Sequence, residues 1–430
     1  MVEGVDFAGT YKKPTVSISV PECLLWLFIA LTPLQDTALQ STPLKLLAAS
    51  PAMLPLSALL FLSCSRVLVN LSIRRIVLIV FAYIAVVCLA YLFKPGLEGV
   101  AFDLKALVSY GFSTALILFA VFGVNYRASR GFRVAVYAAF GITIAGIAVN
   151  ALIGPNAIPA LQATTTVDDL SGRLRGFSTE PGTLSVEIVA IGMLTAHFLR
   201  RPWQQWCSAI VTCGLLVWSS SKGGLICLLL CGIILPIIRS RPSIWIKLLM
   251  VCLIAPFIWL GVLLSFSQFT SLIETNQTST IATRLSMTVY ALITVIHNPF
   301  GVGFTGFLPS IPRYLPQAMG FVQSLFPFGL WFLEVKEYLD PPYINADCKT
   351  FFFDYFAFFG IPFAIVFFVF AYRLLRQLLR CSCYWLFVGV LFCLLALMTY
   401  YSLLNAFAVP ALFGVALCET KRHQASVRMQ

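Results

Sequence analysis

The chain has 430 residues, of which 60% are hydrophobic and only 11% are charged. Soluble domains carry about 25% charged residues, so this composition excludes an ordinary soluble domain and predicts an all-α polytopic membrane protein. The net charge of +12 does not require nucleic acid as a partner, because the cytoplasmic loops of membrane proteins collect Lys and Arg.

Histidines and cysteines do not form a metal or disulfide framework. His197, His297 and His423 have no second His or paired Cys at the spacing of a zinc site. Nearly all of the thirteen cysteines fall in apolar runs or on expected inner loops. We therefore expect no metal, no cofactor and no structural disulfide.

Apolar runs recur along the chain after a short polar start, MVEGVDFAGTYKK, which lacks the regions of a removable signal peptide and is expected to be a cytoplasmic tail. A membrane-spanning helix needs roughly 20 mainly apolar residues. About twelve spans are predicted, within a single membrane domain covering 1–430: 18–34, 44–63, 73–93, 106–124, 132–153, 182–199, 203–221, 222–238, 244–266, 351–372, 383–400 and 402–418.

Charge is distributed unevenly between the two sides of this arrangement. If the chain starts inside, 19 of its 29 Lys and Arg residues lie inside, together with only 4 of its 17 Asp and Glu residues. Such a bias predicts that both termini are cytoplasmic. Trp203, Trp206, Trp245 and Trp385 flank the inner basic loops, where indole rings favour the headgroup level.

Two outer segments are long, residues 154–181 and 267–350, and we expect function to lie there. In the second, apolar residues recur at helical spacing from Ile281 to Ile296 and Asn298-Pro299 ends the run, which predicts an amphipathic helix on the membrane surface. A further apolar run, from Phe321 to Leu333, is interrupted by Pro and Gly. We expect this run to be interfacial or re-entrant.

The stretch GRLRGFSTEPGTLS places Arg173 and Arg175 between Gly172 and Gly176 at the outer boundary. Arginine is suited to bidentate phosphate recognition, so pyrophosphate is the expected ligand. The alternative is that both side chains only extend to the interface beside the preceding aspartates.

The same stretch ends with Glu180 and Pro181. Glu180 can act as a general base or hold an arginine in place, and the second role is the more conservative expectation.

Cationic residues follow in two more outer positions. Lys222 lies in the turn SSSKGG, where it either binds an anion or marks the surface. Arg284 is on the polar side of the surface helix and has the same two roles open to it. Beyond it, NPFGVGF contains Asn298, Gly301 and Gly303, and two glycines spaced by one residue indicate close backbone approach to a ligand.

Polar residues also precede a late span, in the stretch NADCKTFFFD. Asn345, Asp347 and Lys349 are candidates to face the same outer cavity. An ordinary polar entry to a helix explains them as well.

Taken in order, RxRGxxxEP, SKGG, an Arg-bearing helix with NPFGVGF, and a polar lead into a span with FFG resemble the O-antigen polymerase and O-antigen ligase superfamily. The resemblance covers roughly Gly172 to Pro362. It implies a metal-independent glycosyltransferase of the bacterial inner membrane. Its donor and acceptor glycans would be linked to undecaprenyl pyrophosphate, and its partners would include a flippase and a chain-length regulator.

Under this resemblance Arg173, Arg175 and Arg284 bind the pyrophosphate, and the Asp347 region occupies the place where ligases usually have a histidine. The sequence has no histidine between His297 and His423, which favours a repeat-unit polymerase over a ligase. Asp347 or Glu180 would then assist deprotonation of the acceptor hydroxyl.

A secondary transporter is the alternative from a different class. Transporters commonly have internal half-repeats and a long central cytoplasmic connection, and neither is present in this sequence.

Overall fold

The computed structural model describes residues 19–35, 37–41, 50–63, 71–92, 104–126, 129–154, 157–162, 174–239, 279–326, 332–340, 347–402 and 406–428. Their regular structure is helical, with no strand in the described part, as expected from the composition. The elements are α1 (Val20–Leu31), η1 (Ala38–Ser41), α2 (Met53–Ser63), α3 (Leu71–Leu92), α4 (Leu104–Leu118), the π-helical η3 (Phe119–Gly123), α5 (Arg130–Leu152), α6 (Pro181–Phe198), α7 (Pro202–Trp218), α8 (Lys222–Arg239), α10 (Ser279–His297), α11 (Gly303–Leu325), α12 (Leu333–Glu337), α13 (Phe351–Arg380), α14 (Tyr384–Thr399) and α15 (Ala408–Arg428).

Three of the described helices, α5, α6 and α13, are long and apolar enough to cross a membrane. Six shorter apolar helices accompany them, from Val20–Leu31 to Tyr384–Thr399. The outward side of α13 carries large apolar side chains that remain exposed, such as Ile365 and Val366 at 59% and 63%. Such exposure fits association with a membrane, where these side chains contact lipid. The expected span 244–266 lies outside the described residues.

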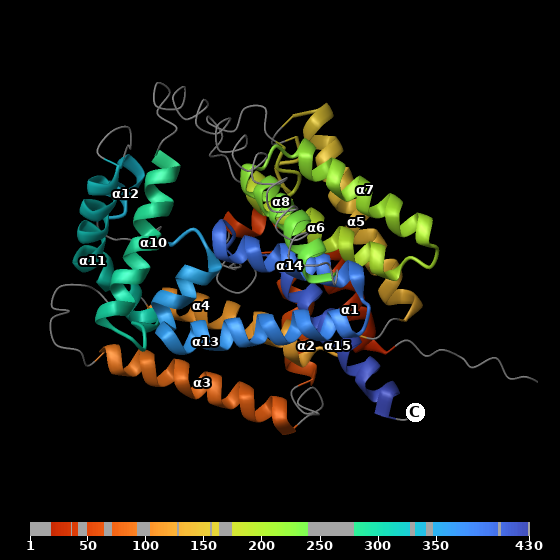
Figure 1. Ribbon diagram of the computed structural model, residues 1–430, viewed down its shortest axis with the longest axis horizontal. Helices are drawn as coiled ribbons and strands as arrows, with labels where there is room; N and C mark the ends of the chain where they lie inside the picture. Colours follow the sequence, from red (N-terminus) through yellow and green to blue (C-terminus); the bar gives the residue numbers. More distant parts are fainter. Residues whose placement is uncertain are drawn as a thin grey trace, which may run out of the picture.

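Two large hydrophobic clusters organise the packing. The larger includes residues of α1, α2, α5, α6, α14, α15 and the later part of α13, and the smaller unites α3, α10 and α11 with the start of α13. Figure 1 shows α10, α11 and α12 together on one side of the molecule, with α5, α6, α7 and α8 on the other and α13 and α14 between them. Because α13 contributes to both clusters, it joins the two halves.

The helix predicted over residues 281–296 is present as α10 and ends at His297, directly before Asn298 and Pro299. One face of it, with Met287, Tyr290 and Ala291, is buried among its neighbours, whereas Ile296 remains 74% exposed. The apolar residues of the predicted pattern, such as Leu285, Val289 and Leu292, are half-buried or exposed, so the buried face of α10 is not the apolar stripe on which the helix was predicted.

The next segment contains a helix that was not predicted, and the interfacial or re-entrant position of the run from Phe321 to Leu333 stays a prediction. Where only an interfacial run from Phe321 to Leu333 was predicted, α11 occupies Gly303–Leu325 and α12 begins at Leu333. Three prolines inside α11 concealed it, because proline removes a backbone hydrogen bond and argues against a helix. A buried apolar face stabilises α11 in spite of them: Phe304, Phe307, Leu308, Ile311 and Leu315.

Candidate functional site

The turn that follows the predicted arginine pair is fixed to α5. The backbone N–H groups of Arg175 and Gly176 donate to Oδ1 of Asn150 over 2.8 and 3.3 Å. Gly176 adopts a left-handed φ of 58°, which glycine tolerates best, and its carbonyl accepts a 2.7 Å bond from Nε2 of Gln162. Arg175 is only 2% exposed, so this arginine is held in the interior rather than on the surface. Gly172 and Arg173 lie outside the described residues.

The buried side-chain carboxyl group of Glu187 contacts this turn. Glu187, in the apolar helix α6, accepts hydrogen bonds from Ser178 Oγ at 2.7 Å and from Gln35 Nε2 at 2.8 Å. Its other oxygen lies 3.3 Å from Thr143 Oγ1. Sequence reasoning missed Glu187, although an acidic residue inside an apolar span was itself a signal. The cluster links the turn to the segment that follows α1, to α5 and to α6.

Glu180 lies immediately before α6, and Lys222 is the first residue of α8. Glu180 is the N-cap of α6, but its side chain is exposed, forms no capping bond and makes no ion pair with a described residue. Pro181 follows as the buried first residue of α6. Lys222 begins α8 after a turn in which Ser221 Oγ accepts from Gly224 N at 3.2 Å, and it is exposed.

Tyr400 connects the starts of α6 and α8. Its hydroxyl lies 2.9 Å from Ser185 Oγ. A Cβ atom on Gly223 would lie 2.7 Å from its ring, and one on Gly182 would lie 3.6 Å away. The ring thus lies against the EPG and SKGG segments, which are 40 residues apart in the sequence. Nothing in the sequence separated Tyr400 from the many other aromatic residues.

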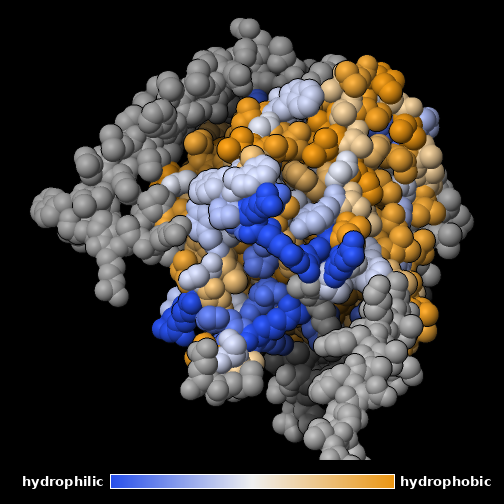
Figure 2. Space-filling view, turned by 90° about the vertical axis from the view of Figure 1, so that its right-hand side faces the viewer, coloured by the Kyte–Doolittle hydropathy of each residue, from blue (hydrophilic) through white to orange (hydrophobic). Residues whose placement is uncertain are grey.

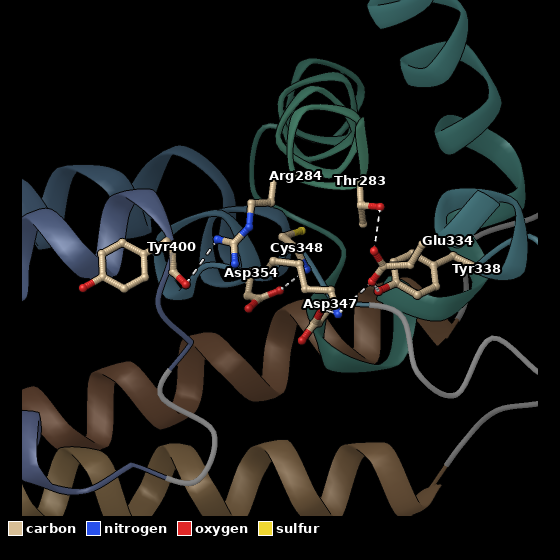
Figure 3. Close-up of polar contacts among 9 residues, drawn as sticks. Thr283, Arg284, Glu334, Tyr338, Asp347, Cys348, Asp354 and Tyr400 are labelled. Atoms are coloured by element: carbon tan, nitrogen blue, oxygen red, sulfur yellow. Dashed lines mark hydrogen bonds and ion pairs between the residues drawn. The ribbon is translucent and has the colours of Figure 1, made fainter. Parts of the chain in front are cut away.

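Arg284 connects α10 to Tyr400 as well. Its Nη1 donates to the carbonyl oxygen of Tyr400 over 3.3 Å, and Figure 3 shows the side chain extending from α10 toward that oxygen. The next residue, Tyr401, accepts a 2.7 Å bond from the backbone N–H of Phe351, the first residue of α13. Residues 400 and 401 therefore contact the EPG segment, the SKGG segment and Arg284, and they also contact the start of α13, which follows the polar lead.

That polar lead forms an ion-paired cluster, drawn in Figure 3. Lys349 Nζ lies 3.3 Å from Glu334 Oε1 and 3.4 Å from Asp347 Oδ1. Glu334 also accepts from Tyr338 at 2.8 Å and from Thr283, the neighbour of Arg284 on α10, at 2.9 Å. Asp347 and Lys349 were predicted to lie in this region, whereas Glu334 and Tyr338 were not. Asn345 lies outside the described residues.

The charges in this cluster stabilise one another. Burial alone would lower the pKa of Lys349, but the attraction of Asp347, Tyr338 and Glu334 raises it above its usual value. Burial alone would raise the pKa of Glu334, but Lys349 and its hydrogen bonds lower it overall. Both groups are thus held in their charged forms.

A second carboxylate lies at the start of α13. Asp354 is 4% exposed, and its Oδ1 accepts a 2.7 Å hydrogen bond from the backbone N–H of Cys348. Asp347 is close enough to interact with it electrostatically. Two carboxylates and a lysine therefore lie on one short segment, residues 347–354. Asp354 was not predicted, because the apolar run FFFDYF that contains it resembles the interior of a span.

The glycines after Asn298 bring backbone close to other parts of the protein, and the expected approach to a ligand stays a prediction. Gly301 has a φ of 83°, and a Cβ on it would overlap the carbonyl oxygen of Phe358 in α13. A Cβ on Gly303 would lie 3.1 Å from Cys88 in α3. Asn298 itself is buried and donates to Thr294 O at 3.0 Å.

The partner of this segment is a kink in α13. Gly360 has a left-handed φ of 65° inside the helix. The kink lets Ile361 N donate to Pro299 O at 2.9 Å, and Val302 N donates to Ala357 O at 3.0 Å. The NPFGVGF segment is therefore a helix-packing element that sets the position of α10 relative to α13.

In the part of the chain that the structure describes, no group of three or more His, Cys, Asp and Glu side chains is arranged to hold a metal ion. The arrangement offers cationic side chains next to carboxylates, which can bind an anion and accept a proton.

No protein-family model matches the chain. The chain is 30% identical over 207 residues to an uncharacterised 49.5 kDa protein in the cps region of Klebsiella pneumoniae. The similarity covers 48% of this chain and 47% of that protein, so the chain spans about half the length of the relative it matches.

Proposed function

We propose that the protein polymerises oligosaccharide repeat units of a bacterial surface polysaccharide that are linked to undecaprenyl pyrophosphate. The observation that carries the proposal is the meeting of the EPG, SKGG and Arg284 segments at Tyr400. These are the segments on which the resemblance to O-antigen polymerases rests. The similarity to a protein from a cps region of Klebsiella pneumoniae supports it.

The proposed enzyme is an inner-membrane protein with about twelve spans, both termini in the cytoplasm and the site at the outer face. The positive-inside distribution of Lys and Arg supports this orientation. Reporter fusions at Arg130 and Arg376 should indicate the cytoplasm, and fusions near Asp169 and Asn345 the outside. A cytoplasmic signal at Asn345 would remove the basis for an outer site.

In the proposed reaction Arg284, with Arg173, Arg175 and Lys222, binds the pyrophosphate of the donor. A hydroxyl oxygen of the acceptor sugar bonds to the anomeric carbon of the donor, and the bond from that carbon to the pyrophosphate breaks. The electron pair leaves with the pyrophosphate, whose developing charge the cationic side chains stabilise. Arg175 is buried, so its contact with the ligand requires neighbouring residues to move.

The hydroxyl proton passes to Asp347 in this scheme. Asp347 lies 3.4 Å from Lys349, and Glu334 provides a second partner for the lysine, so Lys349 stays paired when Asp347 takes the proton. Glu180 is the other candidate base.

Deletion of the gene tests the proposal against a ligase and a transporter. Loss of a polymerase should leave the final acceptor carrying a single repeat unit. Long polymer stranded on the lipid carrier would instead indicate a ligase. Unchanged polysaccharide together with failed export of a solute would indicate a transporter.

A further inference from the structure

A basic pocket lies at the end of the molecule opposite the elements of the proposed site. It is an open cavity of about 800 Å³ between the start of α5 and the turn that joins α6 to α7. Four arginines line it, together with a tyrosine and a glutamine: Arg130, Arg133, Arg200, Arg201, Tyr137 and Gln204. Figure 2 shows hydrophilic side chains gathered on this face, with apolar surface beside them.

Hydrogen bonds hold the walls of this pocket in place. Tyr137 of α5 donates to the carbonyl oxygen of Phe198 at the end of α6 over 3.0 Å. Gln205 of α7 donates to the carbonyl oxygen of Leu199 over 2.8 Å, and its own Oε1 accepts from Trp385 at 3.1 Å. The two elements that carry the arginines are thus tied to each other and to α14, so the pocket is a fixed feature.

The positive charge of the pocket is not neutralised by the described part of the protein. None of the four arginines makes an ion pair with a described carboxylate. Nε of Arg133 is buried and has no hydrogen-bond partner among the described residues. Cationic side chains gathered around one cavity repel one another, and an anion bound among them would relieve that repulsion and supply the missing acceptor.

The pocket lies where a membrane would place its phosphates. α5 and α6 are long and apolar enough to span, and the arginines are at their ends. Trp203 and Trp206, in the first turns of α7, are 59% and 57% exposed, and exposed indoles favour the headgroup level. Val134, 58% exposed, adds an apolar wall to the same pocket.

We infer that this pocket is a binding site for the phosphate of an anionic phospholipid, independent of the proposed polymerase site. The arginines bind the phosphodiester, and the acyl chains continue along the apolar surface beside Val134. Basic pockets at the cytoplasmic ends of spanning helices are suited to such headgroups, because charge attraction and membrane depth act together. Soluble phosphate offers the same anion without the acyl chains.

Purified full-length protein in detergent tests this inference by native mass spectrometry with added phosphatidylglycerol, phosphatidylcholine or inorganic phosphate. Phosphatidylglycerol should bind in preference to phosphatidylcholine. The double variant Arg133→Gln/Arg200→Gln should weaken that binding about tenfold or more, through loss of charge-assisted hydrogen bonds. The double variant Arg373→Gln/Arg376→Gln removes two exposed arginines from α13 and should leave binding unchanged.

Equal binding of phosphatidylglycerol and phosphatidylcholine would contradict the proposed site. Weakening of phosphatidylglycerol binding to the same extent by the control variant would also contradict it. Displacement of the lipid by inorganic phosphate at the same concentration would overturn the lipid assignment. If the Gln variant does not fold, Arg133→Lys/Arg200→Lys decides, because it keeps the charge and loses the planar fork. It should bind phosphatidylglycerol more weakly than the wild type, and unaltered binding would contradict the inference.

Discussion

Nη1 of Arg284 donates a hydrogen bond over 3.3 Å to the carbonyl oxygen of Tyr400, a residue 116 positions away in the sequence. The same tyrosine contacts Ser185 through its hydroxyl and lies against Gly223 with its ring. Arg284 is therefore positioned by Tyr400, the residue that also contacts the starts of α6 and α8. In the proposed function, this is how one guanidinium comes to share a site with the EPG and SKGG segments.

Arg284→Ala should lower polymer formation roughly 100-fold or more, since a donor aimed at a developing negative charge typically contributes that much. Arg284→Lys should restore activity poorly, because lysine keeps the charge but lacks the planar fork. Polymer length on gels, with the amount of protein in the membrane measured in parallel, checks both variants. The matched control is Arg313→Ala in α11, which is exposed and lies over the ring of Tyr314. Normal polymer from Arg284→Ala would exclude Arg284 from the site.

Asp347→Asn and Glu180→Gln distinguish the two candidate bases. Loss of a general base costs roughly 10²- to 10⁴-fold in rate, so Asp347→Asn should fall in that range. Glu180 is exposed and has no described ion pair, so Glu180→Gln should remain close to the wild-type rate. Initial rates of repeat-unit addition measure the difference. The reverse order of the two variants would transfer the role of base to Glu180.

Stability should depend on pH through Glu334 and Lys349. The pKa of Glu334 is lowered from 4.5, so its contribution is present above that value and is lost as the pH falls through the folded-state pKa. The pKa of Lys349 is raised from 10.5, so its contribution is present below that value and is lost as the pH rises through the folded-state pKa. The pair therefore stabilises the protein most between about pH 5 and 10.

Thermal unfolding at pH 7 and pH 4 tests this window. Glu334→Gln should lower stability at pH 7 by about 1 kcal/mol or less, since the pair is partly exposed. The substitution should also reduce the difference in stability that the protein shows between pH 7 and pH 4. Glu337→Gln, an exposed neighbour on α12, should leave that difference as in the wild type. An unchanged pH response of Glu334→Gln would show that the pair does not contribute to stability.

Gly360→Ala should destabilise the protein by several kcal/mol, because its φ of 65° disfavours a side chain and a Cβ would overlap the carbonyl oxygen of Pro299. Gly320→Ala in α11 has nothing within 4 Å of the added Cβ and should be neutral or stabilise by about 0.5 to 1 kcal/mol. Thermal unfolding of both variants compares them. Equal effects would mean that the kink in α13 does not require glycine.

Helices with an uninterrupted apolar pattern were predictable from the sequence. The span expected over 132–153 is α5 at Arg130–Leu152, and the helix expected to end at Asn298 is α10, ending at His297. α11 was not predictable, since its three prolines oppose a helix locally and only its buried face, formed with α10, compensates for them. α13 continues to Arg380, beyond the expected end at residue 372.

Among the candidate residues, those that carry charge in the segments expected to be outside, such as Arg284, Asp347 and Lys349, could be selected from the sequence, and their roles stay predictions. Tyr400 and Asp354 were not, because each lies among aromatic and apolar residues where only tertiary contacts reveal its partners. Gly301 and Gly303 were expected to allow close approach of the backbone, and the structure shows that they lie close to α13 and to Cys88, which no sequence pattern could have identified.

Purified protein incubated with a single species of lipid-linked repeat unit tests the proposed polymerisation most directly. The proposal predicts a ladder of products that carry increasing numbers of repeat units, still attached to the lipid carrier, with release of free undecaprenyl pyrophosphate. Arg284→Ala should abolish the ladder, whereas Arg313→Ala should leave it intact. Unchanged substrate with wild-type protein of verified fold, or transfer of preformed chains only to a separate acceptor, would contradict it.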